Sequence, residues 1–328
     1  MASVRAQVGT VGGVWPLTLI IVLLLQCNTS PSVRNDLVER ALTFRPEGTE
    51  EIVYATDPER LCLLAYPTGG ENPVGAVIFI HGGGWSIPGP DMPLFADWVD
   101  ELNKRNLRSF SIEHRVSPAY RGIDPIEDSI QAFRFIQSRS SEFGFPPDKI
   151  AIMGFSSGGH IAVMTGLKLT SESETSSNPD GRPNPGRSDA YPPVAVVSFY
   201  APMEPGELYQ VGSPGIKSIL EGYLPDPPKN MTDAVQHRAF LQQKFPEISP
   251  GAQLHRGAPP MLLIHGQQDR LVPATQSISF YWKARNLGLN KTQLILVPRG
   301  DHNFNRSRSQ WARLTEQQAL DFIARSIQ

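Results

Sequence analysis

One serine in this sequence lies where it could act as a nucleophile. Ser156 stands in the segment Gly154-Phe155-Ser156-Ser157-Gly158, which follows the apolar run 150–153 and precedes a stretch of helical spacing. On a sharp turn between a strand and a helix, flanking glycines let the backbone pack closely and the hydroxyl projects toward substrate. Such a hydroxyl can attack a carbonyl carbon and form an acyl-enzyme. Because the same spacing also occurs in plain structural turns, the assignment depends on the strand and helix beside it.

A serine nucleophile needs a base, and the sequence holds seven histidines. His302 follows the apolar run 294–297 and precedes the last helical segment, so it should lie at the strand ends, where it can take the serine proton. His265 and His160 compete for the role. His265 ends a strand in an apolar setting, which indicates a structural role, and His160 opens the helix behind the serine and should point away from it.

The third group must be a carboxylate that orients the imidazole and stabilises its protonated form. Asp269 comes just after the apolar run 261–265, and the order serine, aspartate, histidine is the one expected of the fold in which such a serine turn occurs. Asp301 ranks second, because neighbouring residues on a loop seldom face each other. Weaker candidates are Asp226, Asp233 and Glu247.

A glycine run supplies donors for the negative oxygen that forms during acyl transfer. In His81-Gly82-Gly83-Gly84-Trp85, the absence of side chains lets the N–H groups of Gly83 and Gly84 approach a substrate. The N–H of Ser157, at the start of the next helix, is the expected partner. Each donor of this kind contributes roughly 3 kcal/mol to catalysis. The chemistry requires neither a metal nor an organic cofactor, so neither is predicted.

An alternating series of strands and helices must position these residues. Apolar runs that predict buried parallel strands lie at 76–80, 107–112, 150–155, 194–200, 261–265 and 294–297. Segments of helical spacing lie at 94–105, 126–139, 160–169, 275–287 and 311–327. Two short strands at 51–54 and 61–66 precede them as an antiparallel entry. This pattern predicts an α/β fold, a mostly parallel sheet with helices on both faces.

Two segments interrupt the alternation. Residues 171–189 are rich in Ser, Pro, Asn and Gly and are expected to form an exposed excursion. Residues 205–259 are rich in Pro and Gly and contain one expected helix near 233–245. We expect this second segment to cover neighbouring strand ends as a small lid.

The motifs together resemble an α/β-hydrolase of the esterase and lipase group that carries the His-Gly-Gly-Gly motif. Within that group, residues 50–328 resemble the bifunctional feruloyl and acetyl xylan esterase-like family. The matching parts are 81–85, 113–118, 154–160, 248–250 and 259–266, with Asp128, Asp269 and His302. Phe155 and Ser157 depart from the hormone-sensitive-lipase branch, which usually has aspartate and alanine at these positions. The branch of the group, and with it the substrate, is therefore not assigned by these motifs.

The resemblance implies a carboxylic ester hydrolase, with acetyl or feruloyl esters of polysaccharides as expected substrates. An amide hydrolase, either an aryl formamidase or a peptidase of the prolyl oligopeptidase type, is the alternative among enzymes. A catalytically silent hydrolase fold used for binding is the alternative outside enzymes. A small-molecule or polysaccharide ester is therefore the expected partner. Lys+Arg number 30 against 32 Asp+Glu, without a long basic stripe, so nucleic acid is not expected.

The first residues differ from the rest of the chain. Residues 8–25 carry no charge and follow Arg5, a layout typical of an export signal. We expect a signal peptide or lipoprotein signal at 1–30, with Cys27 in a segment similar to a lipobox. A linker at 31–48 and the hydrolase domain at 49–328 follow. The chain is thus expected to be exported: secreted, periplasmic, or attached to a membrane through its N-terminus as a lipoprotein.

Overall fold

The structure is a computed structural model that describes residues 45–176, 191–224, 231, 233–306 and 309–328. The predicted export signal at 1–30 lies outside these residues, as does the predicted linker apart from 45–48. Asp226, one of the weaker carboxylate candidates, also lies outside them. From Arg45 onward the chain forms one compact unit.

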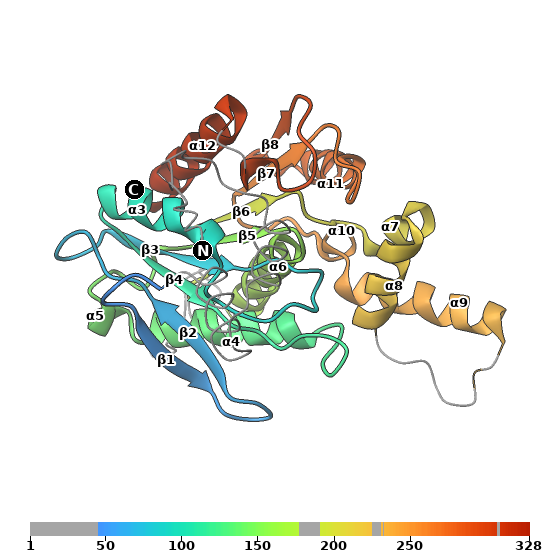
Figure 1. The fold of residues 1–328 in the computed structure, drawn as a ribbon, viewed down its shortest axis with the longest axis horizontal. Helices are drawn as coiled ribbons and strands as arrows, with labels where there is room; N and C mark the ends of the chain where they lie inside the picture. Colours follow the sequence, from blue (N-terminus) through green and yellow to red (C-terminus); the bar gives the residue numbers. More distant parts are fainter. Residues whose placement is uncertain (1–44, 177–190, 225–230, 232, 307–308) are drawn as a thin grey trace, which may run out of the picture. The chain divides into compact units, whose positions relative to one another are not determined.

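A single sheet of eight strands runs through this unit, in the order β1-β2-β4-β3-β5-β6-β7-β8 (Figure 1). The strands are β1 (Glu50–Ala55), β2 (Leu61–Ala65), β3 (Gly75–Ile80), β4 (Leu107–Ile112), β5 (Ile150–Phe155), β6 (Ala195–Phe199), β7 (Met261–Gly266) and β8 (Thr292–Val297). Strands β3 to β8 are mutually parallel, and β2 pairs antiparallel with both β1 and β4. The predicted parallel sheet with an antiparallel entry is confirmed.

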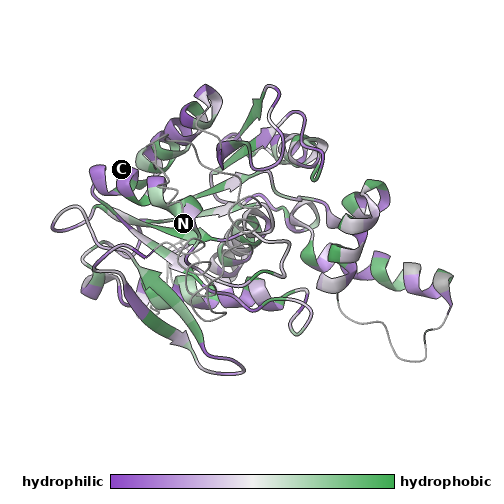
Figure 2. Cartoon of the chain, viewed as in Figure 1, coloured by the Kyte–Doolittle hydropathy of each residue, from purple (hydrophilic) through white to green (hydrophobic). Residues whose placement is uncertain are grey.

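Helices cover both faces of the sheet (Figure 1). On one face lie α3 (Ala96–Lys104) and α12 (Gln310–Ile327); on the other lie α4 (Asp124–Ser138), α6 (Ser157–Ser176) and α11 (Thr275–Asn286). Short helical segments are η1 (Pro93–Phe95), α5 (Ser140–Phe143) and η3 (Phe304–Arg306). Every residue of β3, β5, β6 and β7 is buried, and Figure 2 shows these strands as predominantly hydrophobic. Burial on both faces explains why their sequences are apolar without alternation.

Helix α6 is longer than the sequence pattern indicated. The predicted helix covered 160–169, whereas α6 begins at Ser157 and ends at Ser176. The start of the predicted excursion at 171–189 is therefore helical, and residues 177–190 lie outside the described ranges. Each residue added to an existing helix gains a backbone hydrogen bond without a new nucleation cost, so polar residues can extend it.

The lid, residues 205–259 between β6 and β7, contains more helix than predicted. It comprises α7 (Pro205–Val211), α8 (Pro214–Tyr223), α9 (Ala234–Lys244), η2 (Phe245–Ile248) and α10 (Pro250–Gln253). Only α9 corresponds to the helix expected near 233–245. The prolines begin helices here because the first helical position needs no N–H donor. In α8 the Ser213 hydroxyl also accepts a hydrogen bond from the N–H of Ile216.

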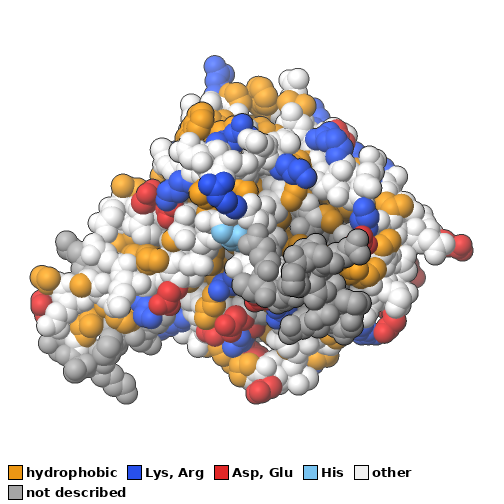
Figure 3. Space-filling model, turned by 180° about the vertical axis from the view of Figure 1, so that it is seen from behind, with side chains coloured by type: hydrophobic (Ala, Val, Ile, Leu, Met, Phe, Trp, Pro, Cys, Tyr) orange, Lys and Arg blue, Asp and Glu red, His pale blue; other side chains and the backbone are white. Residues whose placement is uncertain are grey.

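The outside of the unit is mixed in character. Figure 3 shows hydrophobic side chains in small groups between charged ones on the face drawn there. Among the helices of the described segments, none combines the length and the apolar composition that a membrane crossing requires.

Candidate active site

Ser156 occupies a strained turn between β5 and α6. Its φ is +55°, in the left-handed region that costs a residue with a side chain about 1–2 kcal/mol. A Cβ atom at Gly154 would collide with the backbone of Gly158, and one at Gly158 would collide with the carbonyl oxygens of Ile80 and His81. The glycines thus allow α6 to pack directly against the end of β3. This packing holds Ser156 at the carboxyl edge of the sheet.

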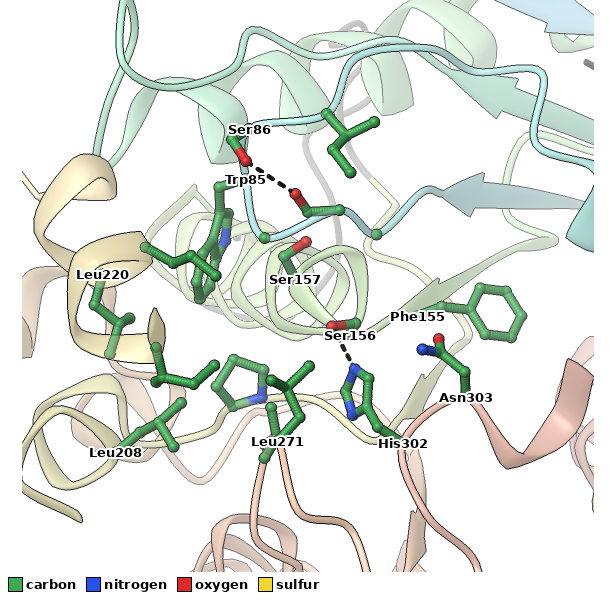
Figure 4. Close-up of a pocket in the computed structure, with 18 of the residues that line it drawn as sticks. Trp85, Ser86, Phe155, Ser156, Ser157, Leu208, Leu220, Leu271, His302 and Asn303 are labelled. Atoms are coloured by element: carbon green, nitrogen blue, oxygen red, sulfur yellow. Dashed lines mark hydrogen bonds between the residues drawn. The ribbon is translucent and has the colours of Figure 1, made fainter. Parts of the chain in front are cut away.

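His302 lies between Ser156 and Asp269, and the structure brings all three predicted side chains together. Its Nε2 atom is 3.0 Å from the Ser156 Oγ atom (Figure 4), and its Nδ1 atom is 2.7 Å from an Asp269 carboxylate oxygen. Because the carboxylate must accept the Nδ1 proton, Nε2 is left to accept from the hydroxyl. The three residues follow β5, β7 and β8, whose carboxyl ends share one edge of the sheet.

Asp269 is buried and held by several donors. One carboxylate oxygen accepts the N–H groups of Leu271 at 2.9 Å and Val272 at 2.8 Å, and the other lies 3.3 Å from His265 Nε2 in addition to its bond with His302. Burial alone would raise the pKa of the carboxyl, but the hydrogen bonds from His265 and His302 outweigh it and hold that pKa well below its usual range. Asp269 is therefore charged at neutral pH and suited to orienting an imidazole.

The two competing histidines do not face Ser156. His265 is fully buried; its Nδ1 atom accepts from the Ser277 hydroxyl at 2.7 Å and its Nε2 atom lies 2.8 Å from the Val272 carbonyl oxygen. His160 is also fully buried and donates from Nε2 to the Ile248 carbonyl oxygen at 2.6 Å. Burial lowers the pKa of His160 to about 4. Sequence patterns indicated that His265 is structural and that His160 points away from the serine, but they gave no sign that His265 contacts Asp269.

The remaining carboxylates are engaged elsewhere. Asp301 forms an exposed ion pair with Arg270 and accepts the backbone N–H of His302 at 2.8 Å, so it holds the loop rather than the ring. Asp233 caps α9, and Glu247 pairs with Lys244 in the lid.

The glycine loop after β3 lies beside the serine turn. Ile80 pairs with Gly154 in the sheet, which places the two following loops next to each other. Gly83 and Gly84 have φ values of +127° and +62°, conformations that favour glycine. In the described chain, neither these two N–H groups nor that of Ser157 donates to another backbone group. All three residues line one cavity with Ser156, so their N–H groups are placed to stabilise an oxyanion there.

Trp85 fixes this loop in place. Its indole stacks on Tyr223 of α8, with ring centroids 4.4 Å apart, and its Nε1–H donates to His160 Nδ1 at 3.3 Å. The loop is thereby tied to both α6 and the lid. An aromatic residue directly after a glycine run was the only sequence signal of this role.

Tyr200 packs edge-on against the His302 ring, with centroids 4.7 Å apart. Its hydroxyl donates to Asn305 Oδ1 at 2.7 Å, which ties β6 to the turn after His302. Burial raises the pKa of this phenol, so it stays neutral. The sequence contained no signal for this contact, because Tyr200 and His302 meet only through the sheet.

The site opens into a cavity of about 380 Å³ (Figure 4). Its lining is mostly apolar and includes Trp85, Ile87, Met92, Leu94, Leu208, Ile216, Ile219, Leu220, Leu271 and Val272. The lid thus supplies part of the wall through α7 and α8. Across the described ranges, no group of three or more His, Cys, Asp or Glu residues is arranged to hold a metal ion.

The sequence pattern that defines the BD-FAE family matches residues 63–284, more than half of the chain. The chain belongs to the BD-FAE family. This confirms the family resemblance and the α/β-hydrolase fold. The BD-FAE match includes Ser156 and Asp269 but ends before His302, so the position of His302 rests on the geometry alone.

Curated relatives of this BD-FAE chain include the probable carboxylic ester hydrolase LipM of Mycobacterium tuberculosis, 28% identical over 69% of this chain and 48% of its own length. The acetylxylan esterase of Xylanibacter ruminicola is 29% identical over 71% of this chain and 42% of its own. The chain therefore spans about half the length of the relatives that it matches.

Solved structures share the fold. A butyrate-bound esterase, Est2 of Thermogutta terrifontis, superposes with a TM-score of 0.62 at 22% identity and covers 85% of this chain and 94% of its own. An acetyl ester-xyloside bifunctional hydrolase of Caldicellulosiruptor lactoaceticus gives 0.61 at 20% identity, covering 83% and 97%. At these identities the likeness establishes the BD-FAE chain's fold and nothing further.

Proposed function

We propose that this protein hydrolyses carboxylic esters through an acyl-enzyme, with Ser156 as nucleophile, His302 as general base and Asp269 as the carboxylate that orients it. One observation carries the proposal: a hydroxyl, an imidazole and a buried carboxylate form a hydrogen-bonded row beside unpaired backbone N–H groups and an apolar cavity. Carboxylic ester hydrolases among the relatives support it.

In the first half of the reaction, Ser156 Oγ attacks the ester carbonyl carbon and its proton moves to His302 Nε2. The carbonyl oxygen becomes an oxyanion that accepts hydrogen bonds from the N–H groups of Gly83, Gly84 and Ser157. When the intermediate collapses, His302 gives the proton to the leaving alcohol oxygen. Water then attacks the acyl-enzyme in the same way, with His302 again as base, and releases the carboxylic acid.

For the substrate we propose acetyl or feruloyl esters of polysaccharides. The acetylxylan esterase among the relatives supports this class, as does membership of the BD-FAE family. The cavity is larger than an acetyl group needs, which favours a bulkier acyl group such as feruloyl. Export through residues 1–30, as a secreted, periplasmic or lipid-anchored protein, would bring the enzyme to such polymers.

The Ser156→Ala variant tests the function. Wild-type protein should hydrolyse aryl acetates and butyrates and be labelled covalently by a fluorophosphonate, whereas the variant should lose both properties and keep its unfolding temperature. Turnover by Ser156→Ala would exclude Ser156 as the nucleophile. Wild-type protein that neither turns over esters nor takes the label would favour the silent binding fold. Faster release from N-formyl anilides than from matched esters would favour amide hydrolysis.

A further inference from the structure

The cavity beside Ser156 has two chemically different sides. On one side the lid and the glycine loop form an apolar wall, in which Leu208 and Leu220 lie beside Trp85 (Figure 4). On the other side lies the loop after β8, where Asn303 follows His302 (Figure 4). Arg306, on the same loop, also lines the cavity. Among the described lining residues, the charged Arg306 and the amide of Asn303 thus share one loop with His302.

The turn that carries Arg306 is firmly held. The backbone N–H of Arg306 donates to the Asn303 carbonyl oxygen at 2.9 Å, and Asn305 Oδ1 accepts a hydrogen bond from the Tyr200 hydroxyl. Phe304 packs edge-on against Tyr200, with ring centroids 5.8 Å apart. The backbone at Arg306 is thus held beside the cavity by contacts to Tyr200, the residue after β6 that also contacts His302.

Within the described ranges, the Arg306 guanidinium lies near enough to Tyr200 to lower the pKa of its phenol, but it has no acidic partner. It forms no hydrogen bond or ion pair there, and the cavity lining contains no Asp, Glu or Lys. Arg270, on the loop after β7, instead forms an ion pair with Asp301. A guanidinium without an acidic partner beside an apolar cavity can bind the two oxygens of an anionic group on a ligand.

The reaction decides which half of an ester meets Arg306. His302 Nε2 must hand its proton to the leaving alcohol oxygen, so the alcohol half lies toward His302 and its loop. The acyl half then lies against the apolar wall of the lid. This placement rests on the proposed function.

We propose that the preferred substrates are esters whose alcohol half carries a carboxylate. This carboxylate pairs with Arg306, while the acyl half packs against the apolar wall of the cavity. A guanidinium can bind both oxygens of a carboxylate through two parallel N–H donors. Asn303, which lines the same side, adds an amide that can hydrogen-bond the same half.

Two matched esters test this proposal: 3-carboxyphenyl butyrate, which is anionic, and 3-carbamoylphenyl butyrate, which is neutral and of the same shape. After division by the rates of hydroxide hydrolysis, wild-type kcat/KM should favour the anion by about threefold to fivefold in low salt, the scale of an exposed ion pair. The preference should shrink at 0.5 M NaCl, because salt screens exposed charges.

Arg306→Gln should remove the preference by lowering kcat/KM for the anionic ester more than for the neutral ester, and Arg306→Lys should retain part of the preference. Arg325→Gln is the matched control, because Arg325 lies near residues that precede β6 and β7, at the opposite edge of the sheet; it should keep the preference. Equal wild-type rates on the two esters, or a preference that survives in Arg306→Gln, would overturn the proposal while leaving ester hydrolysis standing. No turnover of either ester would overturn both.

Discussion

At the scale of single residues, Asp269 concentrates the most interactions in the site. It receives two backbone N–H groups and contacts two imidazoles, and each of these favours its charged form. A carboxylate held this way keeps the His302 ring in one tautomer and one orientation without moving during the reaction. The contact with His265 extends the row by one residue into the core. Asp269 therefore couples the chemistry of the site to its folding.

Asp269→Asn should lower kcat by about 10³–10⁴-fold, because an amide that donates to Nδ1 would impose the wrong tautomer on His302. It should also change stability in acid. The pKa of Asp269 is depressed in the folded protein, so its contribution to stability is complete above the unfolded value of about 3.9 and is lost as the pH falls through the folded pKa. Urea unfolding of the variant between pH 5 and 3 should therefore show a shallower decline than the wild type. Equal declines in the two proteins would contradict this account of the carboxylate.

At the scale of elements, the serine turn works because α6 meets the end of β3 without side chains between them. Gly158→Ala should abolish ester hydrolysis and destabilise the fold, since the new methyl group would meet two carbonyl oxygens of the backbone. Gly222→Ala in α8 is the matched control, because nothing lies within 4 Å of a Cβ atom there. It should stabilise the protein by up to about 1 kcal/mol. Thermal unfolding and aryl ester turnover would measure both, and a fully active Gly158→Ala would exclude the close packing.

Helix α8 should set the preferred acyl length. Each buried methylene contributes roughly 0.8 kcal/mol, so kcat/KM should rise about threefold to fourfold per methylene from acetyl to butyryl p-nitrophenyl esters. Ile219 lines the cavity and lies close to Gly84, so Ile219→Trp should fill the space and remove the rise. Val211→Trp, at an exposed position of α7 outside the cavity lining, should retain the rise of kcat/KM with acyl length. A rise that survives in Ile219→Trp would place the acyl group elsewhere.

The sequence was sufficient to predict the strands of the sheet and the row of candidate site residues, but not the helices of the lid. Buried parallel strands are apolar throughout, and each site residue follows one of them, so strand positions and site positions could be predicted together. The helices α7 and α8 were missed because Pro205 and Pro214 look like breaks, although each begins a helix. Contacts such as Tyr200 with His302 join distant segments, and no local pattern encodes them.

At the scale of the whole molecule, burial lowers the pKa of three of the four buried histidines in the described residues: His81, His114 and His160. His81 and His114 stack with ring centroids 4.2 Å apart beneath the glycine loop, and His160 links α6 to the lid. Burial lowers the pKa of His81 to about 3 and of His160 to about 4, and it also lowers the pKa of His114. The folded state thus depends on imidazoles that the unfolded chain would protonate near pH 6.5.

This arrangement predicts a loss of stability on mild acidification, well above the range in which Asp269 titrates. Below about pH 6.5 the unfolded chain binds protons that the folded protein excludes, so each of these three histidines should cost about 1.4 kcal/mol per pH unit down to its folded pKa. Urea unfolding between pH 7.5 and 5 should show this slope. His160→Gln should reduce the slope by up to about 1.4 kcal/mol per pH unit, whereas His237→Gln, at a partly exposed position on α9, should change it less. An unchanged slope in His160→Gln would mean that His160 is protonated in the folded state, and its bond to Ile248 would then have to compensate for a buried charge.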